Sequence, residues 1–233
     1  MGLEINCEKT KYMIISSDER KRKGNNFTIG NMTFENVDNF EYLGTNINSS
    51  NKISYEIQQR IMAANFANIK LLKTQLLFKA TKFKIYKTLI RPVATYGSET
   101  WNISVTDANK LRVFERKVIR RIYGPVFENG MWRIRSNMEL NNLLKGEDIV
   151  RFAKSQRLRW IGHVERMAET RMPKRLLKAR MTGRRVQGRP RNRWKDEVET
   201  DMRKLDNRGW KRIANNRVEW RKVVQQAQAH PEL

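Results

Sequence analysis

The first fifty residues alternate hydrophobic and polar side chains with a period of two, as half-buried β-strands do. Lys11–Ser16 predicts a short first strand, and Phe27–Ile29 and Met32–Phe34 predict two more. Gly30-Asn31 separates the last two runs, and a two-residue loop of this kind indicates a hairpin. Phe40–Ile47 predicts a further strand, with a bulge at the glycine inside it. We therefore expect a small sheet of three or four strands, which is marginally stable without a covering helix.

From Ser54 onward the apolar residues recur about every 3.6 positions, which predicts helices instead of strands. Three stripes of this kind predict a compact three-helix bundle. Pro92 should kink or split the second helix, and the third should begin after Thr106-Asp107 and end at Gly124. The stripes comprise Ile57, Ile61, Ala64, Leu71 and Leu72; Ile85, Leu89, Val93 and Tyr96; and Leu111, Phe114, Val118 and Ile122.

Beyond Gly124 the pattern stays helical but is looser. Ser136 and Glu139 have the spacing of a capping box, which predicts a helix start. A later apolar face places residues at i, i+3, i+4 and i+7, and we expect its histidine in the core because no second metal-ligand residue accompanies it at metal spacing. That face consists of Trp160, His163, Val164 and Met167.

Two amphipathic helices, Trp194–Leu205 and Trp210–Gln228, are predicted near the end of the chain, with their tryptophans as packing anchors. The predicted fold is thus α+β but predominantly α: a small antiparallel sheet, a three-helix bundle and a basic helical C-terminal region. We expect four segments, which are residues 1–50, 51–124, 125–170 and 171–233.

The charge of the chain adds a functional expectation to this fold. Its 48 Lys and Arg residues exceed its 24 Asp and Glu residues, for a net charge of +24. Residues 1–50 carry 6 basic and 7 acidic side chains, whereas Arg171–Lys195 holds 11 basic side chains and no acidic one. A field of this size attracts phosphate polymers or anionic membranes.

Other compositional features exclude several classes of protein. No run of about 18 apolar residues exists, so a membrane span is not expected. The N-terminus has no apolar signal segment. The single cysteine, Cys7, cannot form an internal disulfide or a cysteine-rich zinc site, and we expect an inert, half-buried thiol. We expect an intracellular, nuclear protein without a membrane partner.

Several ordered motifs resemble one family across nearly the whole chain. They read GLEIN, KTKYM, FEYLG, RPVATYGSETW, ERKVIRRIYG, WRIRSNMEL, RLRWIGHVERM and GRRVQGRPRNRW. In this order they resemble the C-terminal portion of the reverse transcriptase encoded by non-long-terminal-repeat retrotransposons of animals. The resemblance implies a nucleic-acid-binding role and RNA or DNA as the partner.

The resemblance also implies which parts of that enzyme are present. Gly2-Leu3, with Asn6, Lys9 and Thr10, matches a palm motif. The bundle from Ser54 to Gly124 corresponds to the thumb, which follows the primer–template duplex. On this reading, the fingers and most of the palm would precede Met1. The primer-grip motif, whose hairpin holds the end of the growing strand, is matched by Phe40, Tyr42, Leu43 and Gly44.

Polymerase catalysis in such a family requires two Mg²⁺ ions held by aspartates on adjacent strands. This sequence contains no Asp-Asp pair. Lys9 corresponds at most to a palm lysine that acts as an acid toward pyrophosphate, and such an acid cannot function without the metal ions. We therefore expect no cofactor in this chain and no polymerase activity of its own.

The expected nucleic-acid contacts are basic side chains that neutralise phosphates. In the thumb they are Lys70, Lys73, Lys84, Lys87 and Arg91, and in the acid-free run they are Arg184, Arg185, Arg189, Arg191 and Arg193. The run Gly188–Arg191 also resembles the core of an AT-hook, which enters the minor groove. Gln187 replaces the arginine that a full hook carries before its glycine, and a basic linker between helices is the alternative interpretation.

Two other functions stay open at this point. The chain could complete an active polymerase in trans with the missing N-terminal half, or its gene model could lack its start. It could also be a basic helical protein that binds chromatin, ribosomes or anionic membranes, although no long helix with one apolar face suggests membrane binding.

Overall fold

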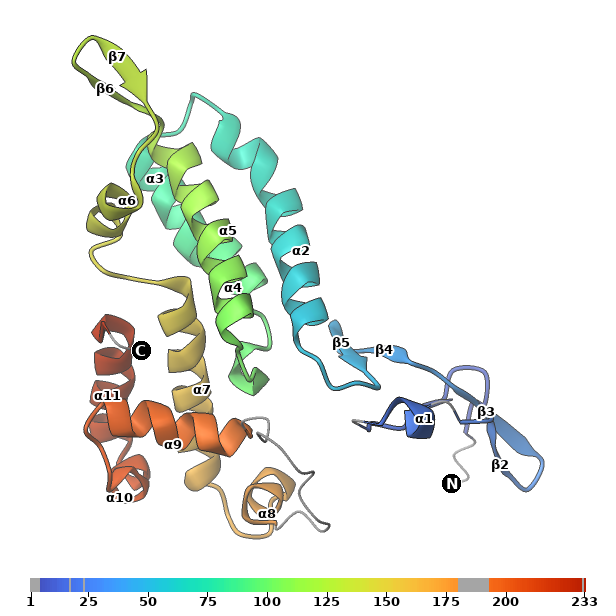
Figure 1. Ribbon diagram of the computed structural model, residues 1–233. Helices are drawn as coiled ribbons and strands as arrows, with labels where there is room; N and C mark the ends of the chain where they lie inside the picture. The colour runs from blue at the N-terminus through green and yellow to red at the C-terminus, as the bar shows by residue number, and fades with distance from the viewer. Residues whose placement is uncertain (1–4, 17, 23, 180–192, 232) are drawn as a thin grey trace. The chain divides into compact units, whose positions relative to one another are not determined.

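The computed structural model (Figure 1) describes residues 5–16, 18–22, 24–179, 193–231 and 233, without the side chains of residues 67–71. The chain divides into two compact units, Met1–Gln59 and Arg60–Leu233. Helices predominate and the strands are short, so the predicted α+β, predominantly α fold class is confirmed. None of the described helices is long and apolar enough to cross a bilayer.

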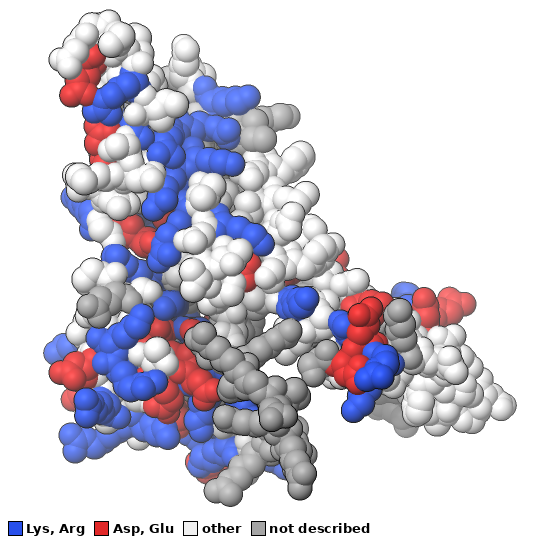
Figure 2. Space-filling model, viewed as in Figure 1, with Lys and Arg blue, Asp and Glu red and all other residues white. Residues whose placement is uncertain are grey.

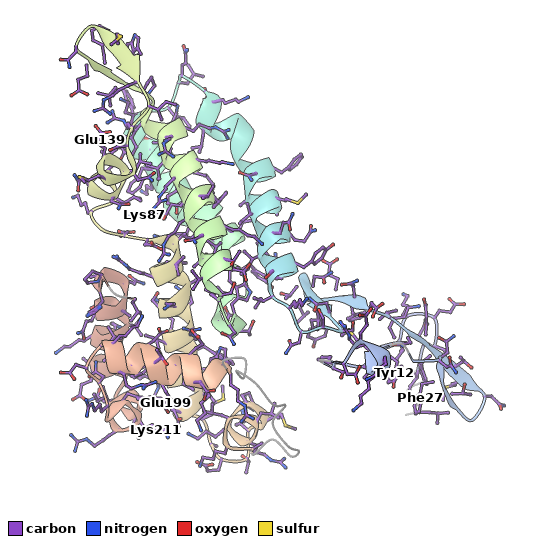
Figure 3. The ribbon with its side chains drawn as sticks, in the orientation of Figure 1. Tyr12, Phe27, Lys87, Glu139, Glu199 and Lys211 are labelled. Atoms are coloured by element: carbon purple, nitrogen blue, oxygen red, sulfur yellow. The ribbon has the colours of Figure 1, made fainter. Side chains whose placement is uncertain are left out.

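The first unit begins with a three-stranded sheet in the order β1-β3-β2, together with a one-turn helix, α1. β2 and β3 form the predicted antiparallel hairpin, and Gly30 adopts φ +56° in its turn. β1 runs parallel to β3, and its Tyr12 ring lies 5.5 Å from the Phe27 ring of β2 (Figure 3). The bounds are β1 Lys11–Tyr12, α1 Glu19–Arg22, β2 Phe27–Ile29 and β3 Met32–Asn36.

The prediction of one bulged strand over Phe40–Ile47 is wrong. The segment is a hairpin in which β4, Asn39–Tyr42, pairs antiparallel with β5, Thr45–Asn48. Leu43 and Gly44 form its turn with φ +49° and +73°, and two successive positive φ values characterise a tight type I′ turn. The chain reverses at the glycine instead of continuing past it, so the head contains two separate sheets.

Little apolar surface is buried in this first unit. Among its described residues, Phe34 and Ile57 are the only hydrophobic side chains that are buried, and every residue of β2 is exposed. Cys7 is half-buried, as predicted. Burial of apolar surface is the main stabilising contribution to a fold, so this unit has a weak core.

We predict that hydrogen exchange is faster over Lys11–Ile47 than over Ile57–Ile122. Amides exchange through local opening, and opening costs less where few apolar contacts must be broken. Exchange followed by mass spectrometry at neutral pH would compare the two regions in one experiment. Equal protection would contradict the weak core inferred for the first unit.

The predicted three helical segments between Ser54 and Gly124 are present. The second consists of three consecutive pieces, because Pro92 has no N–H to donate to the carbonyl of Thr88. The N–H of Arg91 bonds instead to the carbonyl of Tyr86, which widens the turn into a π-helix. The bounds are α2 Ser54–Lys73; α3 Lys79–Ile85, η1 Tyr86–Ile90 and α4 Arg91–Ala94; and, after the 3₁₀ turn η2 Ser98–Thr100, α5 Val105–Tyr123.

Two of the three predicted stripes face the core. In α2, Ile57, Ala64 and Leu72 are buried, and all four stripe residues of α5 are buried. The second stripe is wrong by one position, because Leu89 and Tyr96 are exposed. The buried residues of that segment are Tyr86, Ile90 and Ala94, which lie four apart through the widened π-helical turn.

Side chains determine where these helices begin and end. The start predicted for α5 is one turn late: Ser104 is its N-cap and accepts a hydrogen bond from the Asp107 N–H at 3.1 Å. Gly124 ends α5 with φ +71°, as predicted. Ser136 and Glu139 form the predicted capping box at the start of α6, Asn137–Leu143.

A hairpin that the sequence reading missed lies between α5 and α6. β6, Val126–Glu128, pairs antiparallel with β7, Met131–Arg133. Asn129 and Gly130 form the turn with φ +51° and +78°. Asn-Gly between β-prone residues is the strongest short-range hairpin signal, so the sequence did contain the information.

The C-terminal region consists of helices that pack around α7, which contacts α5, η2, α8, α10 and α11. The predicted helix Trp210–Gln228 is two helices, because Asn216 caps a new one. The prediction that His163 packs in the core is wrong: its side chain is exposed and lies beside the Trp160 ring. The bounds are α7 Ile149–Glu165, α8 Met172–Lys178, α9 Trp194–Lys204, α10 Trp210–Asn215 and α11 Arg217–Ala229.

One hydrophobic core joins α7 to α9, α10 and α11. Trp210 and Trp220 are buried in it with their rings 6.0 Å apart, so these tryptophans anchor packing as predicted. Beside this core, Arg157 of α7 is only 1% exposed. Its guanidinium pairs with Asp201 of α9 and donates to the Trp101 carbonyl at 3.1 Å.

A buried carboxyl group lies between α5, η1 and α7. Glu115 accepts hydrogen bonds from the Tyr86 hydroxyl at 2.5 Å and from the Ile149 N–H at 3.0 Å. Burial raises the pKa of Glu115 to about 7, despite these two hydrogen bonds, which lower it. The native state therefore binds more protons than the unfolded state between about pH 4.5 and pH 7.

We predict that Glu115→Gln becomes progressively more stable, relative to the wild type, as pH rises from 4.5 to 7. The wild type loses stability over this window because its buried carboxyl must ionise, whereas glutamine does not titrate. The difference in unfolding free energy should change by up to roughly 3 kcal/mol. Urea unfolding at several pH values measures it, with the exposed Glu219→Gln as the control. A difference that does not vary with pH would refute the raised pKa.

Candidate nucleic-acid interface

The residues that match the primer grip lie on the β4–β5 hairpin. Phe40 is half-buried, whereas Tyr42 and Leu43 are 58% and 74% exposed at the turn. The carboxylate of Glu56, in the first turn of α2, accepts a hydrogen bond from the Asn46 N–H at 2.8 Å. The helix thus fixes the second strand of a hairpin whose tip presents apolar side chains to solvent.

Lys9 lies in a turn before β1, where its backbone N–H donates to the Asn6 side-chain oxygen at 3.0 Å. Within the part of the chain that the structure describes, no three His, Cys, Asp or Glu side chains converge as metal ligands. The described residues therefore do not fit the Mg²⁺ ions that the sequence resemblance implies.

The predicted thumb cations fall into two groups. Lys73 and Lys84 are exposed, and no acidic side chain of the described residues lies within ion-pair distance of either. Lys87, which Figure 3 labels, and Arg91 instead share Glu147, at 2.6 Å and 2.9 Å. Burial opposes the ionisation of Glu147, but these two partners outweigh it and hold its pKa below the usual range. Glu147 thus offsets one of the two positive charges of the second pair within the fold.

Further basic side chains extend the thumb group. The Phe83 ring of α3 lies 6.3 Å from the Tyr123 ring of α5, which places the two helices side by side. Lys117 and Arg121 of α5 are exposed. On the face shown in Figure 2, Lys and Arg gather over α3 and α5. These α5 residues were not among those predicted from the sequence.

Part of the predicted interface lies outside the described residues. This holds for Arg184, Arg185, Arg189 and Arg191, for the run that resembles an AT-hook, and for the side chain of Lys70. Arg193 is described and stands at the N-cap of α9, where its backbone N–H donates to Asp196 at 3.2 Å. Its side chain is exposed.

The β6–β7 hairpin exposes aromatic side chains beside these basic helices. Phe127 and Trp132 face each other across the two strands with ring centroids 5.1 Å apart, and Trp132 is 71% exposed. Arg133 of the same hairpin pairs with Glu128 and Glu139. The structure thus gives Trp132 a solvent-facing position, unlike Trp210 and Trp220.

A groove between α7 and α11 contains a basic cluster that sequence reading also missed. Its volume is about 790 Å³. The signal was present in the sequence, since Arg159, His163 and Arg166 follow at i, i+4 and i+7 and so share one helix face. The groove is lined by Arg159, His163, Arg166, Arg217, Trp220, Arg221, Val224, Gln225 and Gln228.

Comparison with known proteins provides evidence on the origin of this chain. The chain is similar to an uncharacterized transposon-derived protein of Caenorhabditis elegans. The two are 27% identical over 232 residues, which span 96% of this chain and 83% of that protein. No family model matches the chain, and no solved structure matches it. The similarity fits a transposon origin for this chain.

Proposed function

We propose that this chain is a retrotransposon-derived reverse transcriptase fragment that binds RNA or DNA through backbone phosphates and has no polymerase activity of its own. The observation that carries the proposal is the distribution of charge between the two units. Residues 60–233 contain 41 basic and 16 acidic side chains, whereas residues 1–59 contain 7 and 8. The whole positive excess thus belongs to the helical unit.

Many acidic side chains of the helical unit are already used inside the fold. Glu147 pairs with Lys87 and Arg91, Asp201 pairs with Arg157 and Lys154, and Glu165 pairs with Lys174. The exposed lysines and arginines that have no such partner then face solvent. Cations of this kind bind phosphate polymers by releasing condensed counterions, without reading the base sequence.

The transposon origin supports nucleic acid as the partner, because a transposon must handle its own RNA or DNA. The motifs that resemble a reverse transcriptase add a specific role for each region: the β4–β5 hairpin as primer grip and α2–α5 as thumb. A polymerase step is not proposed, since neither the sequence nor the described residues supply an aspartate pair for the metal ions.

We predict that binding is insensitive to sequence and falls steeply with salt. If about 6–10 phosphates are neutralised, affinity should fall on the order of 10³–10⁵-fold between 50 and 200 mM salt. Fluorescence anisotropy with labelled RNA, single-stranded DNA and duplex DNA of two unrelated sequences measures the slope. A shallow slope, or strong preference for one sequence, would contradict binding through backbone charge.

The contributions of the two basic regions are separable. Replacing Arg184, Arg185, Arg189, Arg191 and Arg193 with Ala should lower the salt slope by several units, at about 0.9 for each duplex phosphate that is no longer neutralised. The set Lys70, Lys73, Lys84 and Lys87 should lower it less, and mainly for duplexes. Within the thumb, Lys73→Ala with Lys84→Ala should weaken binding more than Lys87→Ala with Arg91→Ala, because Glu147 already pairs with both cations of the second set and offsets one of their charges. An arginine variant that keeps its slope while folded would make that run a passive linker.

We predict that the purified chain does not extend a primed template with nucleotides and Mg²⁺ or Mn²⁺. The reason is that no aspartate pair is present to hold the metal ions. Extension is read on a denaturing gel, with a known polymerase as the positive control. Template-dependent extension that disappears in Lys9→Ala would overturn this part of the proposal.

A further inference from the structure

The groove between α7 and α11 is built from arginines on two facing helices. Arg159, His163 and Arg166 follow one face of α7 and its C-cap, and Arg217 and Arg221 lie four residues apart on α11. Residues at this spacing are neighbours on a helix, about 6 Å apart. The groove therefore holds two short rows of positive charge with space between them.

A glycine allows the two helices to approach closely. Trp220 of α11 packs on Gly162 of α7, and its indole N–H donates to the Leu158 carbonyl at 2.9 Å. A Cβ atom at position 162 would lie 1.9 Å from that indole nitrogen, which no contact allows. The exposed arginines on both sides of this contact are thus held on a rigid base.

The groove lacks compensating negative charge. None of its lining residues is acidic, and no acidic side chain in the described ranges lies within ion-pair distance of its four arginines. Arg166 donates to the Ala214 carbonyl at 2.5 Å, but its Nε atom is buried without a hydrogen-bond partner. Burial, followed by the nearby charge of Arg217, lowers the pKa of Arg166. Like charges held together in this way favour an anion between them.

We propose that this groove binds successive phosphates of a nucleic-acid strand. The proposal rests on the function proposed above and adds to it a site outside the thumb assignment, to which the motif RLRWIGHVERM contributes Arg159, His163 and Arg166. Guanidinium groups suit this ligand, because their planar donors can bond two phosphate oxygens at once. Two rows of such groups match a chain of phosphates better than they match a single small anion.

The packing of α11 argues against a membrane surface as the partner. A helix that lies in a bilayer interface must expose an apolar face. Trp220, Val223, Val224 and Ala227 of α11 are buried in the core that it shares with α7, and Val218 is the one large apolar side chain of this helix that is exposed. Toward the groove, α11 presents arginine and glutamine side chains around Trp220 and Val224.

The test compares two triple variants of the full chain with the same loss of charge. The groove variant is Arg159→Ala, Arg217→Ala and Arg221→Ala. The control variant is Arg208→Ala, Lys211→Ala and Lys222→Ala, whose exposed residues do not line the groove. Lys222 is adjacent to Arg221 on α11, and Arg208 and Lys211 lie before and on α10, so the control removes the same charge from positions outside the groove. Thermal unfolding checks that both variants stay folded.

Binding to a labelled 20-nucleotide single strand and to the matching duplex is measured by anisotropy between 50 and 200 mM salt. We expect the groove variant to lose about 2 to 3 units of salt slope and the control variant clearly less. Equal losses in the two variants would show that only total charge matters and would overturn the groove while leaving the proposed function intact. Failure of the wild type to bind either probe would instead overturn the proposed function, and the groove proposal with it.

The same three proteins are mixed with vesicles of phosphatidylserine and phosphatidylcholine at equal salt, in a sedimentation assay. We expect the wild type to prefer nucleic acid. If the groove variant lost binding to vesicles but kept its affinity for both nucleic-acid probes, the groove would be a lipid-headgroup site and the proposal would be wrong.

Discussion

The buried ion pair of Arg157 and Asp201 is the interaction on which the helical unit depends. Each side chain is about 1% exposed, and Lys154 also contacts Asp201 at 3.1 Å. Removing one partner of such a pair leaves an uncompensated buried charge, which costs roughly 3–5 kcal/mol. The pair holds α9 against α7, and the bond from Arg157 to the Trp101 carbonyl attaches the segment after η2. α7 also contacts α5 of the bundle. The bundle and the C-terminal helices therefore pack against the same central helix, α7.

Several acidic side chains of the helical unit lie inside the fold. Asp201, Glu115 and Glu147 are used between helices, where each one joins segments that are distant in the sequence. The acidic side chains therefore contribute to folding while many basic ones remain on the surface. A protein with this division keeps a positive surface without losing internal ion pairs.

The sequence predicted the elements whose signals are local. The β2–β3 hairpin, the buried stripe of α5 and the capping box at Ser136 depend on turn residues, period and a cap, and all three are confirmed. The errors arise where one residue changes the geometry around it. Leu43 adopts a positive φ that leucine rarely takes, so the pattern indicates one strand where the chain forms a hairpin. Pro92 follows a π-helical turn, and the buried residues on and around that turn lie one position after the predicted stripe. The spacing of Arg159, His163 and Arg166 places them on one helix face. It does not predict the groove or the exposure of that face, because both depend on which helix packs opposite.

The spacing of apolar residues in the stretch RLRWIGHVERM predicts one apolar face, but the helix has several faces with different roles. One side of this helix carries core residues and the buried Arg157, a second carries Arg159, His163 and Arg166, and Gly162 lies between them under the Trp220 ring. Because an α-helix has 3.6 residues per turn, one helix can contact a core, pack closely on a partner and line a charged groove only if the residues for each contact lie on different sides of it. A methyl group at position 162 would separate α7 from α11, and the two rows of arginine would then move apart. The glycine that stabilises the core therefore also determines the width of the groove.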